Sequence, residues 1–316
     1  MNKDLRIIFM GTPQFAVNIL DALVAQNYNI VGVVTAPDRP SGRGQKLSES
    51  AVKQFALKQG LPILQPTNLK NETFLQALEA LDGNLQVVVA FRMLPQVVWQ
   101  MPEHGTFNLH ASLLPEYRGA APINWAIING EQKTGVTTFF IDEKIDTGEL
   151  ILQEEIEIST TENAGQLHDK LMFLGSAVVI KTVELIKNGE VKREPQRDLG
   201  SLKTAHKLTK ANCKIDWNDT IYNIHNKIRG LSPYPGAWCE LNNGGEVETL
   251  KIYKSTVELT EHNLEVGTIL CSKHEVKVAV SGGYVLLLEL QLAGKRKMDI
   301  KSLLNGFKFQ NDAKML

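Results

Sequence analysis

Short apolar runs alternate with helix-spaced apolar residues along the first two thirds of the chain. Leu5–Met10 and Ile30–Thr35 are apolar runs typical of buried strands, and Phe15–Ala25 between them has the apolar spacing of a helix. The alternation then continues, with helices expected over 48–58, 71–81, 120–128 and 163–187 and strands over 61–64, 85–90, 108–110, 136–141 and 149–158. Alternating strands and helices predict an α/β fold with a Rossmann-like, open and mostly parallel sheet.

The pattern changes after residue 189. Residues 190–206 are polar and show no periodicity, so we interpret them as a linker. A helix is expected over 217–230, and residues 239–292 form short alternating runs separated by Gly-rich turns, which is typical of a small β-barrel of OB-like type. The sequence therefore predicts three parts, with boundaries at 1–189, 190–206 and 207–316.

Composition places the chain among ordinary globular proteins. It has 316 residues, of which 43% are hydrophobic and 22% charged. Cys213, Cys239 and Cys271 lie far apart and lack the spacing of metal ligands, as expected for free thiols in a reducing compartment. The N-terminus leads directly into a strand and no apolar run has the length of a membrane span, so we expect a cytoplasmic, monomeric protein.

Basic residues gather in two segments although the net charge is only −1. From Ser201 onward there are 16 Lys and Arg against 12 Asp and Glu. Residues 36–47 combine prolines and glycines with Arg39, Arg43 and Lys46, and residues 200–215 carry lysines without any acid: Lys203, Lys207, Lys210 and Lys214. Cations flanked by glycines can reach phosphates, but a solvated surface would have the same composition.

The residues with the clearest chemistry lie between Phe107 and Gly148. Asn108 and His110 are two positions apart on an expected strand, so both side chains project from one face. Asp146 follows in an acidic turn between two apolar runs. An amide, an imidazole and a carboxylate can together stabilise an oxyanion, move a proton and orient the proton carrier. Each residue alone has a structural interpretation, as a hydrogen-bonding histidine or a turn aspartate.

Direct transfer in a ternary complex is the reaction that these residue types favour. No Ser or Cys occupies a turn like that of a nucleophile elbow, which argues against a covalent intermediate. The apolar strand 85–90 runs into Phe91-Arg92-Met93-Leu94, and ligands of open α/β sheets bind at such strand ends. We therefore expect a pocket along Val88–Leu94. No glycine-rich phosphate-binding motif occurs in the chain.

Several motifs resemble those of the folate-dependent formyltransferases, most specifically the members that act on charged tRNA. Asn-x-His-x-Ser-Leu-Leu-Pro-x-Tyr-Arg-Gly spans Asn108–Gly119, and Thr134-Gly135-Val136-Thr137 and Asp146-Thr147-Gly148 resemble later blocks of the family. The tRNA-type members are also resembled by three other segments: Phe9–Pro13, the segment from Pro37 to Gly44, and a C-terminal stretch made of Gln291–Arg296 and Leu303–Gly306. The resemblance covers essentially the whole chain.

The resemblance implies formyl transfer from 10-formyltetrahydrofolate to the α-amino group of methionine on initiator tRNA, without a metal. It implies Asn108, His110 and Asp146 as catalytic residues. It also implies a catalytic domain over 1–189, a tRNA-binding barrel over 207–316, and tRNA contacts by the seven cations named above, with Arg43 matching the arginine of the inserted loop. By the same analogy the folate would contact Val88, Ala90, Phe91, Arg92, Met93, Leu94, Ser112, Leu113, Leu114, Pro115, Ile141 and Asp142. Arg92 departs from the family, in which a glycine often follows the aromatic residue.

Four alternatives remain open at this point. An enzyme that formylates a nucleotide-linked amino sugar would share the three polar residues, but the basic loop 37–46 and Arg118-Gly119-Ala120 count against it. Glycinamide ribonucleotide formyltransferases lack a C-terminal β domain. A formyl-folate hydrolase needs no basic surface for RNA. A folate- or RNA-binding module without activity would gain nothing from the combination of Asn108, His110 and Asp146.

Overall fold

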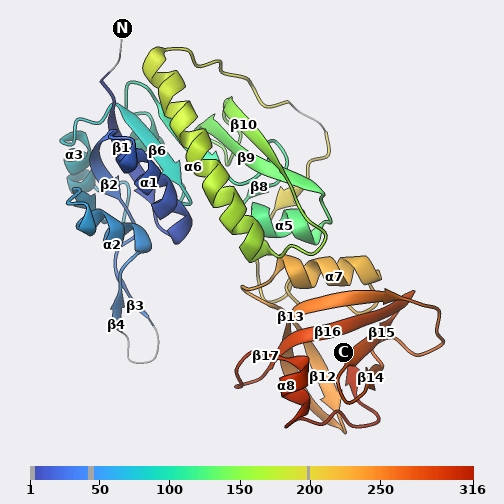
Figure 1. Cartoon of the computed structure of the whole chain (residues 1–316). Helices are drawn as coiled ribbons and strands as arrows, with labels where there is room; N and C mark the ends of the chain where they lie inside the picture. Colours follow the sequence, from blue (N-terminus) through green and yellow to red (C-terminus); the bar gives the residue numbers. More distant parts are fainter. Residues whose placement is uncertain (1–3, 42–45, 198–199) are drawn as a thin grey trace. The chain divides into compact units, whose positions relative to one another are not determined.

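The computed structural model describes residues 4–41, 46–197 and 200–316, and they divide into two compact units (Figure 1). The first unit comprises residues 1–119, 135–156 and 168–203, and the second comprises 120–134, 157–167 and 204–316. Two short segments from within residues 1–189 thus belong to the second unit. The expected division into a catalytic domain, a linker over 190–206 and a tRNA-binding domain stays a prediction.

The first unit is built on a seven-stranded sheet with the order β10-β9-β7-β6-β1-β2-β5. Pairings among β5, β2, β1, β6 and β7 are parallel, whereas β9 runs antiparallel to β7, so the expectation of a mostly parallel sheet is confirmed. The strands are β1 (Arg6–Gly11), β2 (Asn29–Val34), β5 (Ile63–Leu64), β6 (Leu85–Val89), β7 (Thr106–His110), β9 (Lys133–Phe140) and β10 (Leu150–Glu157).

Helices cover both faces of this sheet. The central strands β1 and β6 are therefore buried at every position but one. On one face lie α1 (Gln14–Ala25) and α6 (Ala164–Asn188), where the absence of a side chain at Gly175 lets α6 approach Leu109. The other face holds an apolar cluster that joins Ile8, Met10 and Val88 to side chains around α3 (Glu72–Glu79) and α4 (Gln96–Trp99). The helix α2 (Ala51–Lys58) begins after Ser50, whose side chain accepts a hydrogen bond from Lys53 N.

The second unit contains an antiparallel sheet with the order β14-β15-β16-β13-β12-β18, and β17 pairs with β16. An antiparallel bridge between Thr268 and Lys314 brings β14 and β18 together, which makes the sheet barrel-like as predicted. The helices α5 (Pro122–Ile128) and α7 (Ile221–Gly230) pack together, and Asn124 Nδ2 donates to Gly230 O at 2.8 Å. The strands are β12 (Ala237–Asn243), β13 (Glu246–Leu259), β14 (Ile269–Cys271), β15 (Val276–Val280), β16 (Gly283–Leu292), β17 (Met298–Asp299) and β18 (Lys314–Met315).

Some local expectations differ from the structure. The segment 36–47 is not only a loop, because β3 (Arg39–Ser41) and β4 (Lys46–Ser48) pair as antiparallel strands. The expected helix over 217–230 begins at Ile221 after the cap Thr220, since Trp217 is buried in the barrel core. A short helix α8 (Ile300–Leu304) was not predicted. The remaining elements, β8 (Arg118–Gly119) and β11 (Thr204–Ala205), have two residues each.

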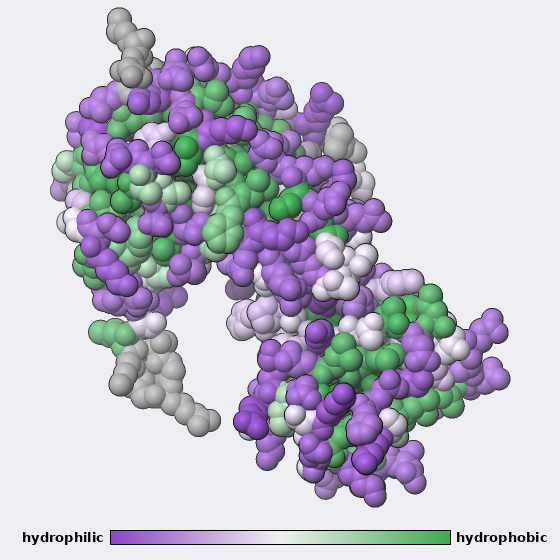
Figure 2. All heavy atoms as spheres, in the orientation of Figure 1, coloured by the Kyte–Doolittle hydropathy of each residue, from purple (hydrophilic) through white to green (hydrophobic). Residues whose placement is uncertain are grey.

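Hydrophilic side chains predominate on the molecular face drawn in Figure 2, and hydrophobic ones are scattered among them. Within the residues that the structure describes, no helix combines the length and apolar character needed to cross a membrane.

Candidate active site

Strand β7 carries Asn108 and His110 on one face, as the alternation along the strand predicts. Asn108 pairs in register with Val88 of β6 and Phe139 of β9, and His110 pairs with Thr137. His110 is buried and Asn108 is half-buried. Among the described residues, none forms a hydrogen bond with the Asn108 side chain, so its amide is available to a ligand.

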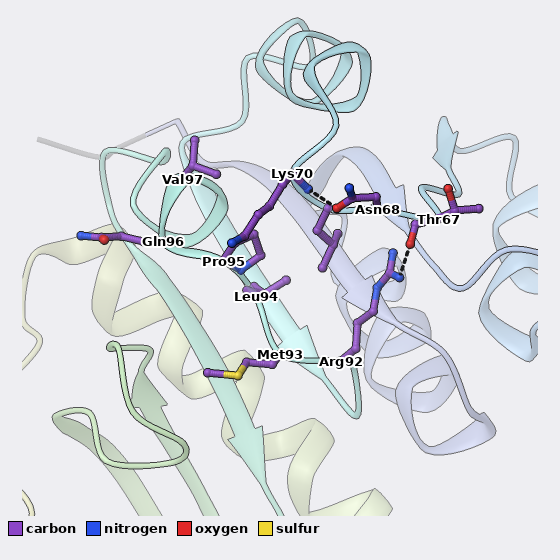
Figure 3. A pocket seen from close by; sticks show the side chains of 10 residues that line it. Thr67, Asn68, Lys70, Arg92, Met93, Leu94, Pro95, Gln96 and Val97 are labelled. Atoms are coloured by element: carbon purple, nitrogen blue, oxygen red, sulfur yellow. Dashed lines mark hydrogen bonds between the residues drawn. The ribbon is translucent and has the colours of Figure 1, made fainter.

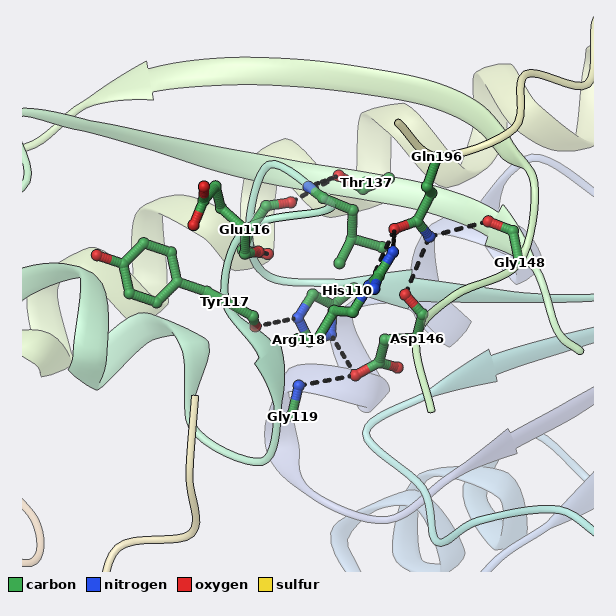
Figure 4. Close-up of polar contacts among 11 residues, drawn as sticks. His110, Glu116, Tyr117, Arg118, Gly119, Thr137, Asp146, Gly148 and Gln196 are labelled. Carbon is green, nitrogen blue, oxygen red and sulfur yellow. Dashed lines mark hydrogen bonds and ion pairs between the residues drawn. The ribbon is translucent and has the colours of Figure 1, made fainter. Parts of the chain in front are cut away.

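The imidazole of His110 is held between two groups of different character (Figure 4). Its Nε2 lies 2.9 Å from the carbonyl oxygen of Tyr117, and its Nδ1 lies 3.8 Å from Asp146 Oδ2. A carbonyl oxygen can only accept, so Nε2 carries a hydrogen and donates it. Nδ1 is therefore the ring nitrogen that can gain or lose a proton, and a carboxylate faces it.

Asp146 lies in a tightly constrained turn between β9 and β10. Its φ of 56° is in the left-handed region, and its Oδ2 accepts a hydrogen bond of 2.9 Å from Gly119 N. Thr147 Oγ1 donates to Asp142 Oδ1 at 2.7 Å across the same turn. At Gly148 a Cβ atom would lie 1.7 Å from Phe140 O, so only glycine fits there. The turn thus presents the carboxylate to His110 in a fixed position.

The loop that follows β7 is braced from the neighbouring strands. Thr137 Oγ1 accepts from Leu114 N at 3.1 Å and donates to Ser112 O at 2.6 Å. Gln153 Nε2 donates to Leu114 O at 2.7 Å, and the Leu114–Pro115 peptide bond is cis. These contacts hold the chain up to Tyr117, whose φ is 60° and whose carbonyl orients His110.

The expected folate-contacting residues occupy three segments of the first unit. Val88, Phe91, Leu94 and Ile141 belong to or pack against one apolar cluster. The segment around Arg92 also lines a cavity of about 780 Å³ (Figure 3), together with residues 67–70 and 95–97. Met93 is 67% exposed there, so it is not a core residue. Ala90 has a φ of 47°, Ser112 and Leu114 are buried, and Leu113, Pro115 and Asp142 are half-buried.

Arg92 is attached to the neighbouring loop rather than extended into solvent. Its NH1 donates to Thr67 O at 2.9 Å, and its NH2 donates to Pro66 O. Burial and the nearby cation of Arg39 lower the pKa of Arg92. The position where Arg92 departs from the resembled family is thus a link between two loops at the rim of the cavity.

The basic hairpin formed by β3 and β4 is anchored at its base. Asp38 pairs with Lys53 and accepts a hydrogen bond of 2.8 Å from Gln65 Nε2, and these hydrogen bonds lower the pKa of Asp38. Arg39 is exposed. Arg43 and the side chain of Lys46 lie outside the described part of the chain.

The four lysines predicted to contact tRNA belong to different units. Lys203 lies in the first unit and is exposed, and Lys207 is exposed in the second. Lys210 and Lys214 both lie over the Trp238 ring, with Nζ 5.0 Å and 5.4 Å from its centroid. Lys214 Nζ also forms an ion pair with Glu240 Oε2 at 2.6 Å, so its positive charge is partly neutralised within the protein.

Sequence reasoning missed the residues that hold the site together. Thr137, Gln153 and Gln196 each bridge segments distant in sequence, and the Tyr117 carbonyl and Gly119 N–H act through the backbone. Tyr117, Gly119 and Thr137 fall in motifs of the sequence, whereas Gln153 and Gln196 do not. Within the described residues, no group of three or more His, Cys, Asp or Glu side chains could hold a metal ion.

Two models of known protein families match this chain. A family model described as formyl transferase matches residues 5–183, more than half of the chain, and one described as formyl transferase, C-terminal domain, matches residues 207–308. The chain belongs to the formyl transferase family. The first matched region contains His110 and Asp146, and the second contains most of the barrel.

Relatives within the formyl transferase family are similar over their whole length. A methionyl-tRNA formyltransferase from Flavobacterium johnsoniae is 60% identical over 313 residues, covering 99% of this chain and 99% of the relative. One from Bacteroides thetaiotaomicron is 52% identical over 318 residues, again covering 99% of each chain.

Solved structures of more distant proteins share the fold. WlaRD, a sugar 3N-formyl transferase crystallised with dTDP and 5-N-formyl-THF, has a TM-score of 0.62 at 20% identity and covers 93% of this chain and 100% of its own. HypX from Aquifex aeolicus in complex with tetrahydrofolic acid has a TM-score of 0.64 at 17% identity, covering 96% of this chain and 47% of its own. At these identities the likeness concerns the fold alone.

Proposed function

We propose that this formyl transferase moves the formyl group of 10-formyltetrahydrofolate to the α-amino group of methionine on charged initiator tRNA. The observation that carries the proposal is the pairing of the buried His110 with the half-buried Asp146, beside the Asn108 amide, which no described residue hydrogen-bonds. The relatives named methionyl-tRNA formyltransferase, at 52–60% identity over nearly the full chain, support this acceptor. The reaction supplies formylated initiator tRNA for translation initiation in the cytoplasm.

In the proposed mechanism the three polar side chains act on one tetrahedral centre. The amine nitrogen attacks the formyl carbon, and the oxyanion accepts a hydrogen bond from the Asn108 amide. Losing one such donor typically costs about 10²–10³ in rate. As the bond from the formyl carbon to the donor nitrogen breaks, that nitrogen needs the proton that the attacking amine loses.

His110 and Asp146 handle this proton through Nδ1. The Tyr117 carbonyl keeps Nε2 as a donor, so the neutral ring offers its lone pair at Nδ1, and the protonated ring can donate toward Asp146 Oδ2 from 3.8 Å away. Gly119 N–H fixes the carboxylate at 2.9 Å. The pair can therefore receive a proton and return it without a covalent intermediate.

The folate is proposed to lie along Val88–Leu94, residues 112–115 and Ile141–Asp142. The adjoining cavity of about 780 Å³ is within the volume range of ligand sites and has an apolar lining around Met93 and Leu94. Such a lining fits an aromatic ring system. The tRNA is proposed to contact Arg39, Arg43, Lys46, Lys203, Lys207, Lys210 and Lys214, with residues 1–189 catalysing the transfer, 190–206 as linker and 207–316 as the tRNA-binding domain.

The test uses purified protein with 10-formyltetrahydrofolate and two acceptors, charged initiator methionyl-tRNA and a nucleotide-linked amino sugar. We expect formyl transfer to the tRNA, lost in His110→Ala but retained in His274→Ala, an exposed histidine of the barrel unit. Transfer only to the sugar would keep the chemistry but refute the acceptor. Transfer to neither acceptor would refute the proposed function.

A further inference from the structure

Gln196 uses every hydrogen-bonding position of its side-chain amide on the candidate active site (Figure 4). Its Nε2 donates to Asp146 O and to Gly148 O, both at 2.9 Å. Its Oε1 accepts from Arg118 Nε at 3.1 Å and from Arg118 NH2 at 2.6 Å. An amide has two donors and two main acceptor directions, so this side chain is saturated. Gln196 lies in the stretch 190–206 that the sequence presents as a linker.

The chain around Gln196 is attached to the same turn. Glu194 and Leu150 form an antiparallel bridge, with Leu150 N donating to Glu194 O at 2.7 Å and Glu194 N donating to Leu150 O at 3.1 Å. The guanidinium of Arg193 lies 4.1 Å from the centroid of the Phe140 ring. Residues 193–196 are therefore attached beside the β9–β10 turn by one isolated bridge at Glu194 and the Arg193 contact, which restrain the backbone from which Gln196 extends.

The position of the Asp146 carboxylate depends on this attachment. Asp146 has a φ of 56°, in the left-handed region that few non-glycine residues adopt and that aspartate tolerates better than most. Inside the turn, Thr147 is bonded to Asp142. On the outside, the two bonds from Gln196 reach the carbonyls on either side of Thr147. Without them the backbone of Asp146 can rotate and carry its carboxylate away from His110.

The same amide fixes the other wall of the site. Arg118 precedes Gly119, whose N–H binds Asp146 Oδ2 at 2.9 Å, and follows Tyr117, whose carbonyl binds His110 Nε2 at 2.9 Å. By holding the Arg118 guanidinium, Gln196 connects the segment that orients His110 to the turn that carries Asp146. One side chain thus spans both halves of the proton-handling pair.

We propose that Gln196 is a positioning residue of the formyl transfer reaction, acting on Asp146 and Arg118 from a segment that lies within the first unit. This inference rests on the proposed function, because it assigns Gln196 to the same proton-handling site. It also assigns residues 193–196 a role in catalysis in addition to that of a linker.

The amide chemistry provides a selective substitution. Gln196→Glu keeps the length and the acceptor for Arg118, but places a carboxylate oxygen against the carbonyls of Asp146 and Gly148, where only a donor is tolerated. Gln196→Met keeps the length without any hydrogen bond. Lys192→Ala alters an exposed residue of the same segment and is the control.

Steady-state kinetics with charged initiator methionyl-tRNA should separate kcat from KM. A displacement of about 1 Å at a catalytic group can cost about 10²-fold in rate, so we expect kcat to fall about that much in Gln196→Glu and Gln196→Met. The KM values for both substrates and the Tm should stay close to those of the wild type, and Lys192→Ala should match the wild type throughout. Wild-type kcat in a folded Gln196→Glu protein would overturn the inference, and so would loss of the fold in both variants.

A double-mutant cycle distinguishes positioning from general support. If Gln196 acts through the His110–Asp146 pair, adding Gln196→Met to Asp146→Asn, in which the pair can no longer pass the proton, should change kcat by no more than about two-fold. Multiplicative losses would overturn the inference while leaving the proposed function intact. If the wild type formylates only the amino sugar, the acceptor assignment fails, and the same cycle on that acceptor still decides the role of Gln196.

Discussion

The two ring nitrogens of His110 have different tasks because they meet different atoms. The Tyr117 carbonyl fixes the hydrogen on Nε2, and the carboxylate of Asp146 faces Nδ1. A histidine with only one defined partner could exchange tautomers, and its proton could leave in either direction. At the scale of single residues, these contacts support the proposed path of the proton through Nδ1.

Replacing the Asp146 carboxylate tests this path. We expect Asp146→Asn to lower kcat by about 10²–10⁴-fold, because the amide cannot take a proton from Nδ1 or balance the charge of an imidazolium. Single-turnover formylation of methionyl-tRNA measures the loss, and circular dichroism should show an unchanged fold. Glu143→Gln removes an exposed carboxylate from the same turn and should retain activity. A near-normal rate in Asp146→Asn would remove this carboxylate from the mechanism.

Among the secondary-structure elements, the β9–β10 hairpin carries Asp146 in its turn. Its geometry depends on the close approach at Gly148, where a Cβ atom would lie 1.7 Å from the Phe140 carbonyl oxygen. That contact is with backbone, which cannot move aside without opening the hairpin.

A single methyl group at this position should therefore disturb the turn. We expect Gly148→Ala to lower both Tm and kcat, because the Phe140–Glu149 end of the hairpin must separate to admit the Cβ atom. Gly306→Ala is the matched control, since nothing lies within 4 Å of its added Cβ atom. Thermal unfolding and formylation kinetics measure both variants. If Gly148→Ala keeps the wild-type Tm and kcat, the turn is less constrained than its contacts indicate.

The β3–β4 hairpin offers a test of the proposed tRNA surface. Arg39 is exposed on β3, and if it contacts a phosphate, Arg39→Ala should weaken tRNA binding and reduce the slope of log K against log salt by about 1. Filter binding at several salt concentrations measures that slope. Lys58→Ala, an exposed cation at the end of α2, should leave it unchanged. An unaltered slope in Arg39→Ala would show that this strand does not touch phosphate.

At the scale of the whole molecule, the barrel unit contains a histidine that makes folding depend on pH. Burial and the neighbouring Arg229 cation lower the pKa of His225 below its usual 6.5, outweighing a hydrogen bond with the Thr160 backbone that raises it. The folded chain therefore prefers the neutral ring, whose Nδ1 lies 3.0 Å from Ser255 Oγ.

The sign of the effect follows from proton uptake. Below about pH 6.5 the unfolded chain binds a proton at His225 before the folded chain does, so the free energy of unfolding falls as the pH decreases through the lowered pKa. We expect His225→Gln to flatten this part of the curve and to run parallel to the wild type above about pH 7.5. Urea denaturation across pH 5–8 measures the difference, and an equal slope in both proteins would contradict the assignment.

Apart from the short elements α4, β3 and β4, the sequence by itself determined the order of strands and helices in the sheet unit, because their apolar periodicity is a local property. It also determined that Asn108 and His110 share one face of a strand and that Asp146 lies in a turn, since strand alternation and turn formation act over a few residues. The starts of α2 and α7 were less accessible, because capping at Ser50 and Thr220 and the burial of Trp217 competed with periodicity.

Only the tertiary structure decided how these residues become a site. The pairing of β3 with β4, the antiparallel entry of β9 and the assignment of residues 120–134 and 157–167 to the barrel unit depend on contacts between distant segments. Gln196 meets Asp146 and Arg118 across 50 and 78 positions. Hydrogen bonds of that kind, and those from backbone groups such as the Tyr117 carbonyl, have no periodic pattern in a sequence, because they form only when the folded chain brings the partners together.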